Sequence, residues 1–279
     1  MSAFVLEFFA SPNVRAALVA SAIVAALSAG IGYFVVLRRL AFAGHAVTDV
    51  GLTGGAGAML AGANPLAGLV AFSVGAALAI GALGGRARER DLATGLVLAF
   101  ALGLGAVFLH VQTTVANAQS SLLFGSVFDI DPALAAVVAV TGALALAALA
   151  LMYRPLLFAS VAPDAARSAG VPVRALGFAF LAVMAIGVAE TAQIVGVLIS
   201  TALLIGPAAT AATLIRDPRK AVACAMLLGI ADVWLAIVCA FASFDLTRGA
   251  QNWPVSFFVA VFALGAYVLA RGLRRLRGA

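Results

Sequence analysis

Apolar residues form runs of about 20 positions along the whole chain, the length that an α-helix needs to cross the hydrocarbon core of a bilayer. Short polar or basic segments separate these runs. The pattern predicts nine spans: residues 15–37, 50–62, 66–83, 92–111, 133–152, 176–189, 194–205, 221–244 and 254–270. Because residues 50–62 are short and rich in glycine, we expect an all-α fold, a polytopic transmembrane helical bundle of about 8–9 spans.

Short punctuating segments divide the later part of the chain. Glu190–Gln193 are expected to separate the sixth and seventh spans, and Gly206–Pro207 to close the seventh. Residues 153–175 form a loop with a compact helix signature, in which Asp164 is placed to cap a short turn and Gly170 to end it. No polar linker separates two units, so residues 1–279 are expected to form a single transmembrane domain.

The distribution of charge predicts an orientation in the membrane. Only 10% of residues are charged, against about one quarter in a soluble domain, and the net charge is +6. Of the 17 lysines and arginines, all but Arg15 and Arg248 fall in loops on one side of the predicted bundle. The positive-inside rule places that side in the cytoplasm, together with the C-terminus, so the positive charge is no argument for nucleic-acid binding.

His45 and Asp49 are the strongest candidates for chemistry. They lie four residues apart, in a stretch that leaves the first span through Arg38 and Arg39, so a helix would place them on one face. Imidazole and carboxylate both bind first-row divalent metals, and ionisable side chains among membrane spans usually serve function. Either the pair binds a metal ion, which we favour, or it only holds the segment in place.

One such pair is too small for a closed metal site, because zinc usually takes four ligands. A symmetric dimer would bring two pairs of His45 and Asp49 to one axis. The sequence therefore suggests a site shared between two copies.

Four other polar residues have two interpretations each. Asp232, in the middle of an apolar span, is either a pathway residue or the partner in a structural hydrogen bond. Glu190 and Gln193 form either a solvated turn between two spans or part of an outer vestibule. His110, at the outer end of the fourth span, is either an interfacial residue or a metal ligand.

The glycines that follow Asp49 also allow two interpretations. Gly51 and Gly55 form a small-xxx-small pattern that lets membrane helices approach closely. The same glycines could instead keep a narrow pore open beside His45 and Asp49.

The chain lacks the sequence motifs of a self-powered transporter or an enzyme. There is no G-x-x-x-x-G-K-[ST], HExxH or nucleophile-elbow motif, so no enzymatic activity and no permanently bound cofactor are expected. The energy for transport would come from an ion gradient or from another subunit.

Four segments carry a resemblance to a known family. They are RRLAFAGHAVTD at residues 38–49, LFG at 123–125, APDAARSAG at 162–170, and the segment from Gln193 to Ala209. Because these four segments occur in this order, the chain resembles the integral membrane permeases of zinc/manganese-type metal ABC importers. Two features depart from the family pattern: Gly44-His45-x-x-x-Asp49 stands where Gly-Asp-x-x-x-His is common, and Ser126 follows LFG in place of an acidic or amide residue.

The resemblance implies a type II ABC importer-like permease in the cytoplasmic (inner) membrane of a bacterium. It would move a divalent transition metal, with zinc ahead of manganese or iron. Its partners would be a second copy of the chain, two cytoplasmic ATPase subunits and an extracytoplasmic metal-binding protein. The ATPases would dock on the loop that contains Asp164, Arg167 and Gly170.

Two alternatives remain open from the sequence. The same architecture could move another small solute, such as a metal chelate. A gradient-driven secondary transporter would act without ATPase subunits and would need Asp232 as a proton carrier.

Overall fold

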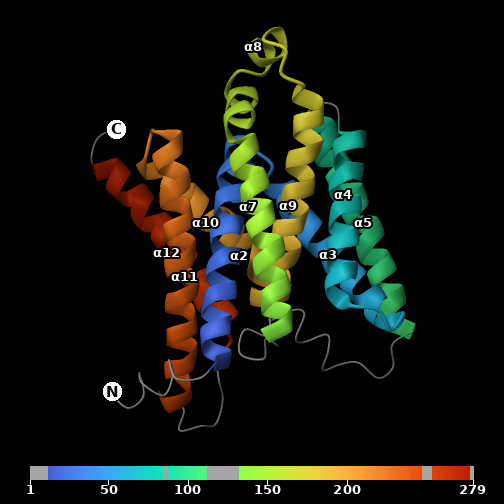
Figure 1. The fold of residues 1–279 in the computed structure, drawn as a ribbon, viewed down its shortest axis with the longest axis vertical. Helices are drawn as coiled ribbons and strands as arrows, with labels where there is room; N and C mark the ends of the chain where they lie inside the picture. The colour runs from blue at the N-terminus through green and yellow to red at the C-terminus, as the bar shows by residue number, and fades with distance from the viewer. Residues whose placement is uncertain (1–11, 85–86, 112–131, 247–252, 277–279) are drawn as a thin grey trace.

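The computed structural model describes residues 12–84, 87–111, 132–246 and 253–276 of the 279-residue chain (Figure 1). In these residues the helices are α2 (Pro12–Leu37), α3 (Ala41–Leu60), α4 (Pro65–Leu83), α5 (Ala87–Val111), α7 (Pro132–Val161), α8 (Pro163–Ser168), α9 (Val173–Val195), α10 (Val197–Leu214), α11 (Pro218–Leu246) and α12 (Val255–Leu276). The all-α prediction is confirmed.

The helices form an elongated bundle with one projecting tip. In Figure 1, α2, α7 and α9 occupy the centre, α4 and α5 lie on one flank, and α11 and α12 lie on the other. The short helix α8 projects beyond the other helices, and we call this end of the bundle the α8 end. Among the described residues, seven helices are long and apolar enough to cross a membrane. Two further helices pack alongside these seven: α3, and α10 with its shorter apolar stretch. The total agrees with the prediction of about 8–9 spans.

The core at the centre of the bundle is built around α2. Phe34 is fully buried and packs edge-on against Tyr153 of α7 and Phe180 of α9. Other apolar side chains of α2 pack with α10, α11 and α12 in a second buried cluster. Helix α2 therefore contributes apolar side chains to both large buried clusters and is the central helix of the bundle.

Several predicted boundaries are wrong. Glu190–Gln193 do not separate two spans, because α9 continues to Val195 and the chain breaks at Gly196, whose φ of 105° favours glycine. Helix α10 passes through Pro207 to Leu214, since a proline inside a membrane helix removes one hydrogen bond without ending it. Helix α7 likewise continues beyond the predicted residue 152, through Pro155, to Val161.

The predicted loop of residues 153–175 is mostly helical. It consists of the last turns of α7, the six-residue helix α8 and the start of α9. Asp164 does not cap α8, because the cap position is Ala162 and Asp164 lies in the first turn. Gly170 does follow the end of α8, with a φ of 81°.

Candidate metal site

The candidate site begins at the tight turn between α2 and α3. The amide of Arg38 donates to the carbonyl of Phe34 at 2.9 Å, and that of Leu40 donates to Val35 at 2.8 Å. Arg39, with a φ of 56°, has the left-handed conformation that commonly ends a helix. The turn reverses the chain within three residues, so α3 starts at Ala41 and His45 lies about one turn inside it.

Glycines bring α10 against both helices of this turn. A β-carbon at Gly32 of α2 would overlap the backbone carbonyl of Leu204, and one at Gly44 of α3 would lie 2.9 Å from a methyl carbon of Leu204. At position 32 only hydrogen lets the backbone of Leu204 approach α2, and at position 44 the missing side chain leaves room for the Leu204 methyl group. This close packing brings Thr201, one turn earlier in α10, next to His45.

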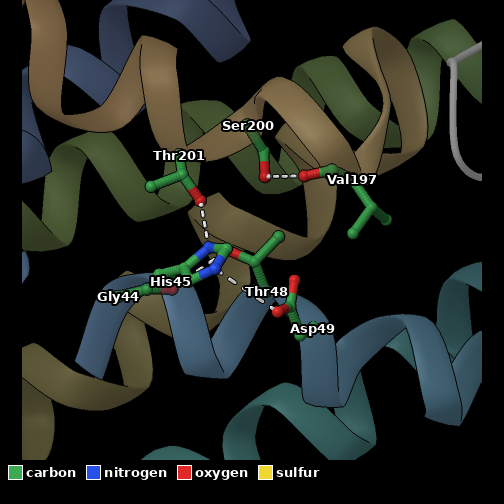
Figure 2. A network of polar contacts seen from close by, with 7 residues as sticks. All are labelled: Gly44, His45, Thr48, Asp49, Val197, Ser200 and Thr201. Atoms are coloured by element: carbon green, nitrogen blue, oxygen red, sulfur yellow. Dashed lines mark hydrogen bonds and ion pairs between the residues drawn. The ribbon is translucent and has the colours of Figure 1, made fainter. Parts of the chain in front are cut away.

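His45 and Asp49 lie on the same face of α3, as the sequence predicted (Figure 2). The Nδ1 atom of His45 lies 3.1 Å from the hydroxyl oxygen of Thr201. The other ring nitrogen, Nε2, lies 3.5 Å from Oδ2 of Asp49. The His45 side chain is 49% exposed and that of Asp49 is 26% exposed, so the pair is open on one side.

These distances suit a pair of metal ligands. Ligands bound at about 2.1 Å to one tetrahedral ion lie about 3.4 Å apart, close to the Nε2–Oδ2 separation. A direct N–H···O hydrogen bond would be shorter, in the range of about 2.7–3.2 Å. When Nδ1 donates its proton to Thr201, the lone pair of Nε2 is free for a cation beside Asp49.

The rest of α3 is fixed by hydrogen bonds with its neighbours in both directions. Ser73 of α4 donates to the carbonyl of Val47 at 3.2 Å, and Thr53 of α3 donates to Ala101 of α5 at 3.1 Å. Gly54 lies directly against Gly68 of α4. The contacts of Gly54 agree with the close-packing interpretation of the glycine run.

The pair is incomplete as a metal site within one chain. Among the described residues, no group of three or more His, Cys, Asp and Glu side chains lies close enough to hold an ion. Any further ligands would have to reach the open side of His45 from elsewhere.

The structure does not bring Glu190 or Gln193 to this site. Glu190 is 1% exposed and lies inside α9, where its carboxyl group faces Gly142 of α7. Thr141 of α7 lies near the Glu190 carboxyl group, but its hydroxyl donates to the carbonyl of Val137 at 2.8 Å. Neither carboxyl oxygen of Glu190 nor Oε1 of Gln193 forms a hydrogen bond of good geometry in the described residues. The interpretation of these residues as a solvated turn is therefore wrong.

Asp232 and His110 also lie apart from the pair. Asp232 is 7% exposed on α11, and neither of its carboxyl oxygens forms a hydrogen bond with the described residues. His110 is exposed at the end of α5, close to Phe108, which packs on Gly57 of α3. Gly57 is about 18 Å along α3 from His45, so His110 does not face the pair.

The predicted coupling residues lie together at the α8 end. Nη1 of Arg167 is 2.7 Å from Oδ1 of Asp164, and their side chains are 64% and 92% exposed, respectively. The backbone amide of Gly170 donates to the carbonyl of Arg167 at 3.0 Å. The segment thus presents a short, polar, projecting helix (Figure 1).

Sequence reasoning missed Thr201. It lies 156 residues from His45, and a threonine in an apolar helix usually satisfies its hydroxyl within its own helix. The only available signal was its place in the segment from Gln193 to Ala209. The LFG motif at residues 123–125 and Ser126 lie outside the described residues.

Comparison with known proteins identifies the family. Residues 10–267 match the model of the ABC 3 transport family. The manganese transport system membrane protein MntC of Listeria innocua is 28% identical over 248 residues, which cover 88% of each chain. The high-affinity zinc uptake system membrane protein ZnuB of Haemophilus influenzae is 26% identical over 249 residues, covering 89% of this chain and 95% of ZnuB.

A solved structure has the same fold. PsaBC from Streptococcus pneumoniae, in complex with Fab, superposes with a TM-score of 0.83 at 21% identity, covering 96% of this chain and 94% of the other. The resemblance deduced from the four sequence segments is confirmed. The chain belongs to the ABC 3 transport family.

Proposed function

We propose that this chain is the membrane permease of an ABC importer that moves a divalent transition metal, with His45 and Asp49 as its ligands. The observation that carries the proposal is the 3.5 Å gap between Nε2 and Oδ2, beside an imidazole whose other nitrogen is held by Thr201. Family membership supports it, because relatives are named for manganese, zinc and, provisionally, iron transport.

The working unit in this proposal is a homodimer. An ionisable pair on an open face of a membrane bundle is costly when it faces lipid, so a partner surface is needed to cover it. A second copy placed about a two-fold axis would add its own imidazole and carboxylate. Two pairs together would supply about four ligands, the usual number for zinc.

The α8 end would face the cytoplasm and contact the ATPase subunits. The basic residues of the chain favour this orientation under the positive-inside rule. The projecting helix α8, with Asp164 and Arg167 exposed and Gly170 behind it, offers a compact docking element. An extracytoplasmic metal-binding protein would deliver the ion to the opposite end.

The donor set does not choose one metal. Two imidazoles and two carboxylates suit both zinc and manganese. The preference for zinc therefore stays a prediction, as does the effect of the exchanged order of His45 and Asp49 relative to the family pattern.

Reconstitution tests the proposed energy source. We expect liposomes containing this chain and its ATPase subunits to accumulate a divalent metal only when ATP is supplied on the side of α8. The matched control contains the chain alone under a proton gradient. Accumulation in that control, lost on Asp232→Asn, would establish the secondary-transporter alternative instead. If the liposomes take up the metal only as its chelate, the substrate is the chelate and not the bare ion.

A further inference from the structure

A second polar region lies at the α8 end, separate from His45 and Asp49. It is a pocket of about 550 Å³ where the end of α2, the end of α4, the short helix α8 and the beginnings of α5 and α9 meet. Four arginines line it: Arg38, Arg90, Arg167 and Arg174. The rest of the lining is largely apolar and includes Leu40, Ala82, Phe178 and Leu181. The pocket therefore combines concentrated positive charge with hydrocarbon walls.

The positive charge of the pocket is not neutralised by the described part of the chain. Only Arg167 has an ion-pair partner there, Asp164, while Arg38, Arg90 and Arg174 have none. Glu89 and Asp91 flank Arg90 on α5, but neither lines the pocket. Like charges held together at a partly buried site repel each other, so an anion bound between them would be stabilised.

Arg38 is fixed in place rather than free in solvent. Its guanidinium carbon lies 5.4 Å from the centre of the Phe180 ring, in a cation–π contact. Partial burial lowers the pKa of Arg38, and the charge of Arg90 lowers it further, but a guanidinium stays charged at neutral pH. This arginine is thus a preorganised donor with several N–H groups.

Two glycines line the pocket: Gly81 lets α4 pack closely on α9, and Gly177 leaves space beside Arg38. A β-carbon at Gly177 would lie 3.9 Å from Nη2 of Arg38, and one at Gly81 would lie 2.8 Å from a methyl carbon of Leu181. A side chain at position 177 would therefore occupy space beside the Arg38 guanidinium. The cavity lies where the end of α2 meets the neighbouring ends of α4 and α5 and, much later in the chain, α8 and the beginning of α9.

We propose that this pocket binds the phosphate headgroup of an anionic phospholipid. Arginine suits phosphate because its planar fork donates two parallel hydrogen bonds. Basic pockets between membrane helices on the cytoplasmic side are typical sites for anionic headgroups, and the apolar walls suit the glycerol and upper acyl chain. The pocket lies at the level where membrane helices end, directly after Leu37 of α2 and Leu83 of α4.

The bound lipid would also support the metal site. Arg38 lies in the turn that starts α3, three residues before Ala41, and so connects the pocket to the helix of His45. An anion that bridges Arg38, Arg90 and Arg174 would fix this turn relative to α5 and α9. The inference goes beyond metal transport but uses the orientation proposed above.

Lipid binding to the purified full chain tests this site. Native mass spectrometry would count retained phosphatidylglycerol and phosphatidylcholine for the wild type, Arg90→Gln/Arg174→Gln and the control Arg216→Gln. Arg216 is exposed at the same end and outside the pocket. We expect wild type and control to bind phosphatidylglycerol alike. The double variant should bind it about twenty-five-fold more weakly, about five-fold per arginine, with phosphatidylcholine unaffected.

A second variant separates pocket occupancy from charge and folding. Gly177→Leu keeps every arginine but fills the space beside Arg38, and it should also lose phosphatidylglycerol if the pocket is the site. Melting temperatures without added lipid would show that both variants fold. Equal phosphatidylglycerol binding by all variants would overturn the proposal.

Two other results would give the pocket a different occupant. If millimolar inorganic phosphate displaces phosphatidylglycerol and stabilises the wild type equally, the site binds a soluble anion and the lipid assignment is wrong. If the variants keep the lipid but lose the ATPase subunits, the pocket receives acidic residues of that protein. Because none of these measurements uses metal or transport, failure here leaves the proposed function untouched.

Discussion

Two carboxylates of the bundle, Asp49 and Glu190, have opposite surroundings. Asp49 is partly exposed and lies 3.5 Å from an imidazole that is oriented by Thr201. Glu190 is 1% exposed, faces Gly142, and has no hydrogen-bond partner in the described residues. An ion in transit needs a ligand that is accessible and that lies beside a second ligand already held in the right orientation. Asp49 meets both conditions, and Glu190 meets neither.

The largest expected effect comes from disturbing the packing of α10 against α2 and α3. This packing places Thr201 beside His45, the neighbour of Asp49. Gly32→Val would force side-chain atoms into the carbonyl of Leu204 and push α10 away from α2 and α3. We expect a loss of about 3 kcal/mol in stability, seen as a lower melting temperature and lower yield of folded protein. The matched control is Gly75→Val in α4, where an added β-carbon meets no atom within 4 Å. Equal losses in both variants would contradict the role of Gly32.

A smaller effect is expected from removing the group that orients His45. Thr201→Val keeps the shape of the side chain but loses the hydroxyl beside Nδ1. We expect a 10–100-fold rise in the metal concentration that half-saturates uptake, as is usual for partners of metal-binding histidines. Thr201→Ser should restore the wild-type value.

Thr213→Val provides the control for the same chemical change. The Thr213 hydroxyl donates to the carbonyl of Ala209 within α10, so its loss should not change metal affinity. If Thr201→Val and Thr213→Val behave alike, Thr201 does not orient the ligand.

The smallest effect is expected at Glu190. Glu190→Gln replaces a sealed carboxyl group by an amide of nearly the same shape, so uptake should be unchanged and stability should change by at most about 1 kcal/mol. Asp49→Asn measured in parallel should lose uptake. Equal loss in both variants would place Glu190 on the ion path and remove the distinction between the two carboxylates.

Much of the fold could be predicted from the sequence because bilayer thickness fixes the length of apolar runs. The spacing of His45 and Asp49 was also readable, since positions four apart share a helical face. The helix boundaries near Glu190 and Pro207 were not readable, because polar and proline residues are tolerated inside packed membrane helices.

Contacts across the bundle were beyond the sequence. The approach of Thr201 to His45 depends on how Leu204 of α10 fits between Gly32 and Gly44, which lie far from it along the chain. Likewise, the pocket around Arg38 forms only where α2, α4, α5 and α9 converge. A single sequence marks such residues as glycine, threonine or arginine without pairing them.

The most direct test of the central claim is elemental analysis of cells that lack this gene, grown in metal-poor medium. They would be complemented at matched expression with the wild type, His45→Ala, Asp49→Ala or the exposed control His110→Ala. The account predicts that the wild type and His110→Ala restore one divalent metal, while His45→Ala and Asp49→Ala do not. Restoration by all four proteins would contradict the assignment of His45 and Asp49 as the metal ligands.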